Sequence, residues 1–332
     1  MDNARVLYID AFNYFYAQLQ VNKAMDENGE PIGGFIGLVD QIQRLVYRFN
    51  PHRVVVIFDG PDAGMRRRSL FPDYKGRKAR KKHLSKVDIG DTPIEIDNEE
   101  QQLKLAYAFL RLLPVTISII PFYEADDIIT HLALKNINQE SIICSSDKDY
   151  LQIVQDNISV WAWGKKTLFT PVEVVEQFKV MPENFAYFRC IVGDSSDKLP
   201  GIEGIGETTI LKLVPKLTTE AFVDFEAFWQ YVMNLDSQLI TETKIRNSLT
   251  SLKEQKDQAW LMYRLMKLGA DQLKLKAVEQ LRVQLAEQQV PRFDSMKLKI
   301  HCIKNHLEPH FKYFDSWTRP FVTIKKTITL NA

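Results

Sequence analysis

Four short apolar runs, each followed by acidic residues, constrain the fold of this chain more than any other feature. The runs span residues 6–9, 54–58, 115–120 and 142–144 and are rich in Val and Ile. Short β-branched runs bounded by polar residues are typical of strands buried on both faces of a parallel sheet. Segments with the apolar spacing of helices lie between them, such as the one after the candidate caps Asp97 and Asn98. The alternation predicts an α/β fold with a mostly parallel central sheet and helices on both faces.

Acidic residues follow each predicted strand. Residues 123–132 read YEADDIITHL, in which three acids precede apolar residues at helical spacing. A helix N-terminus favours negative charge, but three acids exceed what a cap needs. Two carboxylates about 4 Å apart repel by roughly 4 kcal/mol at an effective dielectric near 20. The sequence therefore predicts a positively charged partner beside this segment.

Acids at the ends of different strands are expected to converge, because ligand sites in open α/β sheets form at the carboxyl ends of strands. Hard oxygen ligands without nearby His or Cys select Mg²⁺ or Mn²⁺ over zinc. Two such ions can activate a water and stabilise the leaving oxygen in phosphodiester hydrolysis. Any one acid alone could be a cap or turn residue, but the whole set favours a metal site. Its members are Asp10, Asp59, Glu124, Asp126, Asp127, Asp147, Asp149, Asp194 and Asp197.

Positive charge is concentrated in one block. The net charge is only +1, yet residues 66–86 carry ten Lys or Arg against one acid, Asp73. Such a run is often a solvated loop. Its interleaving with Phe71 and Tyr74 favours nucleic acid, because aromatic rings can stack on bases while cations follow the backbone.

The residue pattern of the sequence changes after Trp163. The spacing of GIEGIG predicts a helix-hairpin-helix turn whose amides face a phosphate backbone. From about residue 221 the pattern is mostly helical, and we interpret Trp229, Tyr231 and Met233 as core. Residues 320–330 alternate like a strand or an extended tail. The expected divisions are a core over 1–185 with a basic arch at about 62–96, a helix-hairpin-helix region over 186–220, and a helical region over 221–332.

The remaining features place the protein among globular cytoplasmic proteins. Its 332 residues are 45% apolar, enough for a sizeable core. We find no run long enough to cross a membrane and no signal peptide at the start. Cys144, Cys190 and Cys302 have no paired spacing, so we interpret them as inert core thiols. His131 is interpreted as a structural histidine.

The motifs resemble those of the flap endonuclease and 5′ to 3′ exonuclease family, especially its bacterial and phage branch. The matching stretches, in family order across residues 5–215, are VLYIDAFNYFY, VVVIFDG, FPDYKGRKARK, YEADDIITHLA, SSDKDYLQIV, TPVEVVEQFKVMPENF and GDSSDKLPGIEGIGETTILKL. Together, YEADD, SDKDYLQ and GDSSDxxPGxxGIG are highly specific. The resemblance implies a PIN-like central sheet, a helical arch over the active site and a helix-hairpin-helix on duplex DNA.

The resemblance also implies roles for individual residues. A first metal ion is expected at Asp10, Asp59, Glu124 and Asp126, with Asp127 beside them, and a second at Asp147, Asp149, Asp194 and Asp197. Lys75 matches a lysine that contacts the scissile phosphate, and Arg67 matches an upstream basic position, so both join Asp10 and Asp59 as candidate catalytic residues. Further nucleic-acid contacts are expected from Tyr74, Arg77, Lys78, Arg80, Lys81, Lys82, Gly201, Gly204 and Gly206. Lys78 departs from the family, where bacterial members tend to have an Arg, and the two are not equivalent phosphate clamps.

The function implied by the resemblance is that of a two-metal, structure-selective 5′ nuclease in a bacterial or phage-infected cell. Mg²⁺ is the expected cofactor, Mn²⁺ a substitute, and K⁺ a further cation at the helix-hairpin-helix. Expected substrates are DNA with 5′ flaps or ends and RNA·DNA hybrids, with primer removal as the role. A monomer without membrane contact is expected, and docking of a replication clamp or single-strand-binding protein is left open. The alternatives are a PIN-like ribonuclease and a non-catalytic binder of branched DNA.

Overall fold

A six-stranded sheet forms the centre of the protein. The computed structural model describes residues 4–76, 84–89, 92–287, 293–324 and 329–332. The strand order is β5 (Thr116–Ile120), β2 (Arg53–Asp59), β1 (Arg5–Asp10), β6 (Glu140–Cys144), β7 (Ile158–Ala162) and β8 (Thr167–Phe169). All neighbours are parallel except β7 and β8. The four predicted strands and the mostly parallel sheet are confirmed.

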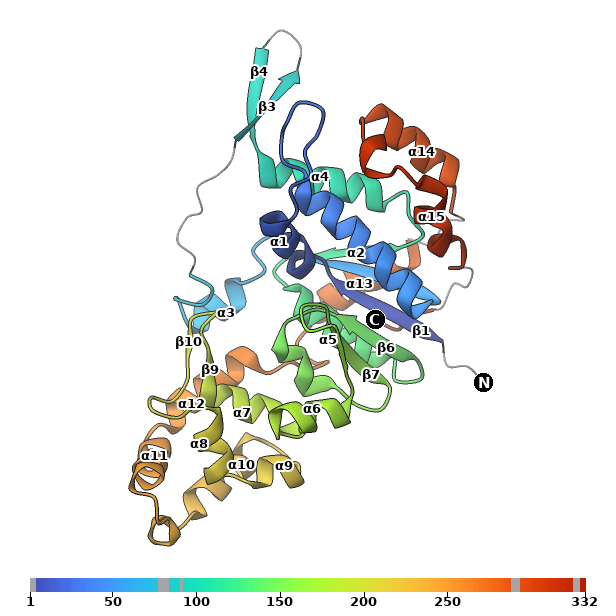
Figure 1. Cartoon of the computed structure of the whole chain (residues 1–332). Helices are drawn as coiled ribbons and strands as arrows, with labels where there is room; N and C mark the ends of the chain where they lie inside the picture. Colours follow the sequence, from blue (N-terminus) through green and yellow to red (C-terminus); the bar gives the residue numbers. More distant parts are fainter. Residues whose placement is uncertain (1–3, 77–83, 90–91, 288–292, 325–328) are drawn as a thin grey trace.

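Helices cover both faces of this sheet, as predicted (Figure 1). One apolar cluster lies under α1 (Ala11–Val21), α2 (Gly33–Phe49) and α4 (Asn98–Leu110), together with α14 (Ser295–Lys304) and α15 (Phe314–Val322). The other lies under α5 (Ala125–Lys135), α6 (Pro171–Phe178) and α7 (Phe185–Val192). Residues of β1 alternate between the two clusters, with Leu7 in one and Tyr8 in the other. This is why the strands read as continuous apolar runs.

The register brings the acidic strand ends to one edge. Asp10 ends β1 opposite Ile57 of β2, and Asp59 ends β2 opposite Ile120, the last residue of β5. Several of the acids also begin the next element, since Asp10 caps α1 through the Asn13 amide and Asp147 caps the 3-10 helix η1 (Lys148–Ile153). Local capping and the strand ends therefore place these carboxylates together.

The stretch predicted to form a helix-hairpin-helix lies between the sheet and a group of helices. After η2 (Pro182–Asn184) and α7, a short hairpin of β9 (Gly193–Asp194) and β10 (Leu199–Pro200) leads to α8 (Glu207–Leu213). The remaining elements at this end are α9 (Lys216–Thr219), α10 (Phe225–Asn234), η3 (Ser237–Leu239), α11 (Thr243–Glu254) and α12 (Lys256–Met266). Among the described residues, no helix is long and apolar enough to span a membrane.

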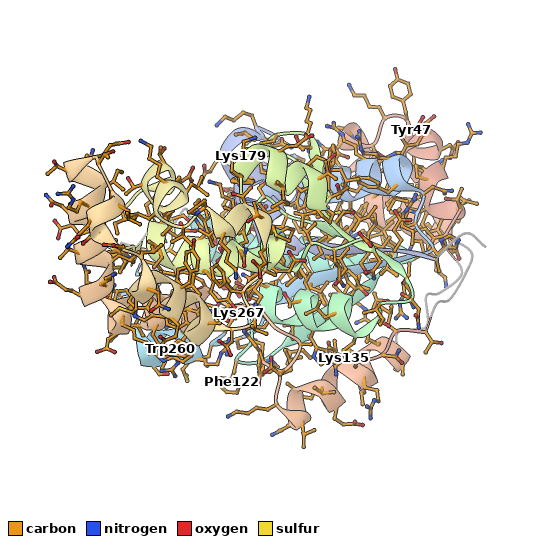
Figure 2. All side chains as sticks on the ribbon, turned by 90° about the horizontal axis from the view of Figure 1, so that it is seen from below. Tyr47, Phe122, Lys135, Lys179, Trp260 and Lys267 are labelled. Carbon is orange, nitrogen blue, oxygen red and sulfur yellow. The ribbon has the colours of Figure 1, made fainter. Side chains whose placement is uncertain are left out.

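Stacked aromatic rings attach α10 and α12 to α7. Tyr187 of α7 stacks on Tyr263 with centroids 5.3 Å apart, and Tyr263 stacks on Trp260 at 5.6 Å. Trp260, labelled in Figure 2, is the half-exposed outer ring of this group. Trp229 is buried as predicted, but Met233 is 45% exposed. The core assignment of Met233 is wrong because α10 has only one face against its neighbours.

Two further expectations are corrected. The arch was expected to be helical, and α3 (Met65–Leu70) is a helix, but β3 (Leu84–Ile89) and β4 (Thr92–Asp97) form an antiparallel hairpin. Alternating β-branched residues such as Ile94 and Ile96 favour strands. Residues 77–83 lie outside the described part of the chain. Residues 320–322 belong to α15, which follows η4 (Glu308–His310), so they are not a strand.

The edge strand β5 is covered by α13 (Leu275–Glu287). The Gln284 side chain donates to the Ile119 carbonyl at 2.9 Å and accepts from the Ile119 amide at 3.3 Å. It also accepts from the Ser118 hydroxyl at 2.9 Å. A side-chain amide thus takes the place of a neighbouring strand, which prevents this edge from pairing with another chain.

Replacing Gln284 by Ala is expected to destabilise the fold. The Ile119 backbone groups and the buried Ser118 hydroxyl would lose their partner, so the free energy of unfolding should fall by about 1–3 kcal/mol. Urea denaturation would measure the change. Gln280→Ala, at an exposed position of the same helix, is the matched control, and equal effects of both substitutions would contradict a role for the edge contact.

Candidate active site

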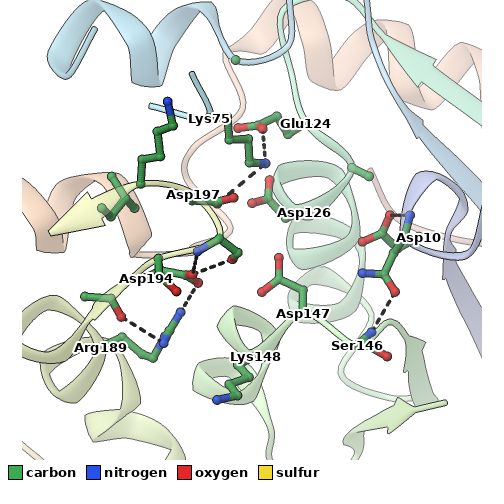
Figure 3. A pocket seen from close by; sticks show the side chains of 18 of the residues that line it. Asp10, Lys75, Glu124, Asp126, Ser146, Asp147, Lys148, Arg189, Asp194 and Asp197 are labelled. Carbon is green, nitrogen blue, oxygen red and sulfur yellow. Dashed lines mark hydrogen bonds and ion pairs between the residues drawn. The ribbon is translucent and has the colours of Figure 1, made fainter. Parts of the chain in front are cut away.

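The acids at the strand ends line one pocket. Its volume is about 1290 Å³, and it opens at the carboxyl edge of the sheet between α3, α5 and the β9–β10 hairpin (Figure 3). The predicted acids that line it are Asp10, Asp59, Glu124, Asp126, Asp147, Asp194 and Asp197, and Glu207 of α8 lines it as well. The predicted convergence is therefore observed for seven of the nine acids.

The other two acids, Asp127 and Asp149, lie behind the pocket wall. Asp127 closes the capping box of α5 with Glu124 and pairs with Arg66 and Arg67 at 3.0 and 3.1 Å. Asp149 accepts from the Arg189 Nε at 3.2 Å. As the side chains stand, both carboxylates are bound to cations of the protein and neither lines the pocket.

Arg67 is the positive partner that the acid-rich YEADD segment predicts. Its guanidinium is buried and binds Glu124, Asp126 and Asp127 together. Its Nε donates to the Leu265 carbonyl at the end of α12, at 3.1 Å. Arg67 does not line the pocket. Its buried position indicates a counterion for the acids more than a direct contact of substrate.

Lys75 connects the two halves of the acidic ring. Its Nζ lies 2.6 Å from Glu124 and 3.9 Å from Asp197, and its backbone amide donates to the Asp197 carbonyl at 3.0 Å. It has a positive φ of 49°, and its side chain lines the pocket. Lys75 is therefore a cation of the basic block that both lines the pocket and contacts its acids (Figure 3).

Tyr74 is not placed as expected. Its side chain is 3% exposed, and its hydroxyl donates to Glu124 at 3.2 Å. A ring packed into the core cannot stack on a base, so the stacking role is corrected to support of Glu124. The five basic residues predicted to contact nucleic acid further along, namely Arg77, Lys78, Arg80, Lys81 and Lys82, lie outside the described residues.

The pocket carries more negative charge than its cations balance. Burial, then the charge of Asp59 and more weakly that of Asp147, raises the pKa of Asp10 to about 7. Burial is also the main reason that the pKa of Asp149 rises to about 7 and that of Asp197 to about 6. Glu124 differs, because Arg67 and Lys75 outweigh its burial and lower its pKa to about 2. Carboxyls that resist ionisation beside one another are typical of a site that accepts cations.

The donor set fits divalent metal ions. It consists of carboxylate oxygens, the ligands that Mg²⁺ and Mn²⁺ prefer. Within the described residues, no three acidic, His or Cys groups converge closely enough to hold a metal ion as they stand. Arg67, Lys75 and Arg189 are ion-paired with four of the lining carboxylates, namely Glu124, Asp126, Asp194 and Asp197. Mg²⁺ keeps several waters and binds through one or two carboxylates, so an open ring of acids is sufficient.

Sequence reasoning missed Arg189 and two aromatic residues. Arg189 of α7 is buried; it binds Asp149 and Asp194 and donates to the Gly193 carbonyl at 3.1 Å. No local pattern marks this residue. Phe12 and Tyr16, with ring centroids 5.4 Å apart, also line the pocket. Their i, i+4 spacing directly after Asp10 is a signal that could have been used.

The three glycines of GIEGIG differ in how strongly the backbone requires a glycine at their positions. At Gly201 an added Cβ would lie 2.4 Å from the Ile191 carbonyl oxygen, while Gly204 has a φ of +78°. At Gly206, which precedes α8, an added Cβ would meet nothing within 4 Å. The turn therefore lies between α7 and α8 as predicted, but only Gly201 and Gly204 are demanded by the backbone.

Gly201→Ala is expected to cost about 1–3 kcal/mol in the free energy of unfolding, because backbone atoms must move to admit the methyl group. Gly206→Ala should cost less than about 1 kcal/mol. Thermal unfolding of both variants would measure this difference. A stable Gly201→Ala protein would show that the contact between Gly201 and the end of α7 is looser than described.

The fold and the acid-lined pocket define a hydrolase-like α/β protein, and comparison with known proteins gives its family. The model of the 5′-3′ exonuclease, N-terminal resolvase-like domain, matches residues 5–179. The chain belongs to the 5′-3′ exonuclease family and is a nuclease that hydrolyses phosphodiester bonds, which confirms the resemblance found in the sequence.

Relatives of known description agree. The chain is 29% identical over 270 residues to a 5′-3′ exonuclease of Buchnera aphidicola, covering 80% of this chain and 86% of that protein. It is 30% identical to the 5′-3′ exonuclease of Bacillus subtilis, covering 66% and 72%. Against DNA polymerase I of Thermus thermophilus it is 32% identical, covering 63% of this chain but 24% of the polymerase. The T5 D15 protein shares the fold at a TM-score of 0.58 with 14% identity, covering 97% of this chain and all of that one.

Proposed function

We propose that the protein is a structure-selective 5′ nuclease that cuts DNA at 5′ ends and 5′ flaps with the help of two Mg²⁺ ions. The observation that carries this proposal is the ring of seven carboxylates with Lys75 between its halves. A structural neighbour, the phage T5 D15 flap endonuclease, is described in a complex with DNA and metal ions, at a TM-score of 0.59 and 14% identity. That description supports a DNA substrate and divalent metal use here.

The acids divide into two groups around the pocket. Asp10, Asp59, Glu124 and Asp126 would hold one ion, and Asp147 with Asp197 would hold the other, joined by Asp149 and Asp194. A pair of divalent cations supplies an activated water and stabilises the leaving oxygen when bound. Manganese has the same ligand preference and would substitute.

Lys75 orients the substrate in this proposal. Its ammonium lies between Glu124 and Asp197, where a phosphate between the two groups of acids would meet it.

Phe12 and Tyr16 border the same pocket and offer rings on which bases can stack. Backbone amides of the 201–206 turn would contact duplex phosphates, a position that can also take K⁺ through its carbonyls. These contacts would select the junction between duplex and single strand.

The biological role proposed is removal of flaps and RNA primers in a bacterial or phage-infected cell, by a monomer acting in the cytoplasm. Activity on RNA·DNA hybrids belongs to this proposal. A replication clamp or single-strand-binding protein is a candidate partner. A PIN-like ribonuclease or a non-catalytic binder of branched DNA would explain fewer features, since the first needs no 201–206 turn and the second no acids.

One assay tests the proposal. The full chain would be incubated with a labelled 5′-flap DNA, a blunt duplex and an RNA·DNA hybrid, each with Mg²⁺ or with EDTA. We expect Mg²⁺-dependent cleavage at the flap junction and release of short products from the 5′ end. Binding of the flap without cleavage under any divalent ion would leave only the non-catalytic reading.

A further inference from the structure

Helix α14 has apolar residues on two opposite faces. Leu298 and Cys302 are buried against the sheet-covering layer. Met296, Ile300 and Ile303 are 63%, 44% and 50% exposed. With 3.6 residues per turn, these three side chains fall within about 60° of one another, directly opposite the buried pair. We call Met296, Ile300 and Ile303 the outer stripe.

The outer stripe differs from ordinary exposed apolar residues. Tyr47 and Trp260, labelled in Figure 2, are exposed singly on their helices, and isolated apolar side chains are normal on protein surfaces. A surface helix usually has one apolar face. The spacing i, i+4, i+7 is that of the anchors by which helices dock on one another. The outer stripe therefore resembles a contact face.

Lysines border the outer stripe on both sides. Lys299 lies about 70° to one side of it and Lys304 and Lys297 about 70–90° to the other, from the helical geometry. The helix carries no acid between Ser295 and Lys304. Lys297 has only a distant pair with the N-cap Asp294 at 3.9 Å, and Lys304 has no ion-pair partner in the described part of the chain. Lys299 lies over the Phe314 ring, with its Nζ 6.0 Å from the ring centroid, and makes no ion pair with a described residue. The border is therefore positive.

We propose that α14 is a docking site for a partner protein that presents an amphipathic helix with acidic residues bordering its apolar face. Apolar side chains of the partner would cover Met296, Ile300 and Ile303, and its acids would face the three lysines, which favours encounter and orientation. A second copy of this chain is disfavoured, because two outer stripes facing each other would bring lysines against lysines. Nucleic acid is disfavoured because the centre of the surface is apolar.

The position of α14 suits recruitment. It lies beside α15 on the layer over α2 and α4, away from α3 and the β9–β10 hairpin that border the acidic pocket (Figure 1). A partner bound there would leave the pocket open. Such a partner would deliver the nuclease to its place of action, whichever substrate the nuclease cuts.

Two labelled synthetic peptides test this proposal with the full chain. Both are helical and share a Leu stripe; one has Glu at the bordering positions and the other has Lys. Fluorescence anisotropy is expected to show the Glu peptide binding at least about tenfold more tightly than the Lys peptide. The double substitution Ile300→Asp/Ile303→Asp should weaken binding of the Glu peptide at least about tenfold. The melting temperature and the nuclease rate of this variant should be unchanged. Leu239→Asp, which changes a residue 81% exposed elsewhere, is the matched control and should bind like wild type.

A charge swap makes the test specific. In Lys299→Glu/Lys304→Glu the preference should reverse, so that the Lys peptide binds more tightly than the Glu peptide. Equal binding of both peptides by wild type, or Glu-peptide binding that survives the Asp substitutions, would overturn the proposal. So would a dimer of the wild-type chain, or binding to vesicles of phosphatidylserine and phosphatidylcholine, that the same Asp substitutions abolish.

Discussion

Asp147→Asn is expected to lower the single-turnover rate of flap cleavage by about 100-fold or more while leaving the fold intact. Asp147 lines the pocket, and no cation of the described residues pairs with it. Its charge contributes, after burial, to the raised pKa of Asp10 and Asp149. Asparagine can still cap η1, where the Asp147 carboxylate accepts from the Asp149 amide at 2.8 Å. The substitution thus removes the negative charge that the cation needs and keeps the local structure.

Three measurements separate this effect from unfolding. The melting temperature should stay the same or rise, because repulsion within the pocket is relieved. Binding of Mn²⁺, followed by calorimetry, should weaken. Asp156→Asn, at an exposed acid outside the pocket, should change neither rate nor Mn²⁺ binding. A fully active Asp147→Asn protein would remove Asp147 from the proposed site.

Lys75→Ala is expected to depress the cleavage rate far more than it weakens DNA binding. Its ammonium is the cation that lies between Glu124 and Asp197, where the scissile phosphate is proposed to sit. Loss of a group that acts mainly in the transition state lowers kcat and kcat/KM together, and we expect a loss of about 100-fold. Single-turnover rates at saturating enzyme, with Kd from anisotropy, would measure the two effects separately.

Lys198→Ala is the matched comparison for Lys75. Lys198 also lines the pocket but is exposed and makes no ion pair with the acids among the described residues. The Lys198→Ala substitution should weaken DNA binding with little change in the cleavage rate. It should also flatten the dependence of the binding constant on salt, whose logarithmic slope is near 0.7 per single-strand phosphate contact. Lys81→Ala and Lys82→Ala should behave in the same way. Equal loss of rate in the Lys75 and Lys198 variants would show that both act only through overall charge.

The sheet and most of the acidic ring could be predicted from sequence because their signals are local. A buried parallel strand must be apolar at every position, so residues 54–58 are recognisable without any knowledge of their neighbours. An acid directly after such a strand, as Asp59 is, has to lie at the carboxyl edge. The pairing of β3 with β4 was missed because the resemblance suggested a helical arch there, although Ile94 and Ile96 alternate as in a strand.

What the sequence by itself determined is the position of the four strands β1, β2, β5 and β6 and of most acids at their common edge. The counterions of those acids were decided by the tertiary structure. Arg189 meets Asp149 because α7 packs on η1. Arg67 is positioned among the acids of YEADD by its hydrogen bond to the Leu265 carbonyl at the end of α12, nearly two hundred residues later in the chain. No periodicity records such contacts, because a buried charge needs a partner in space and not at a given spacing. For the same reason Asp127 and Asp149, which the sequence does not distinguish from the neighbouring acids, lie behind the pocket instead of lining it.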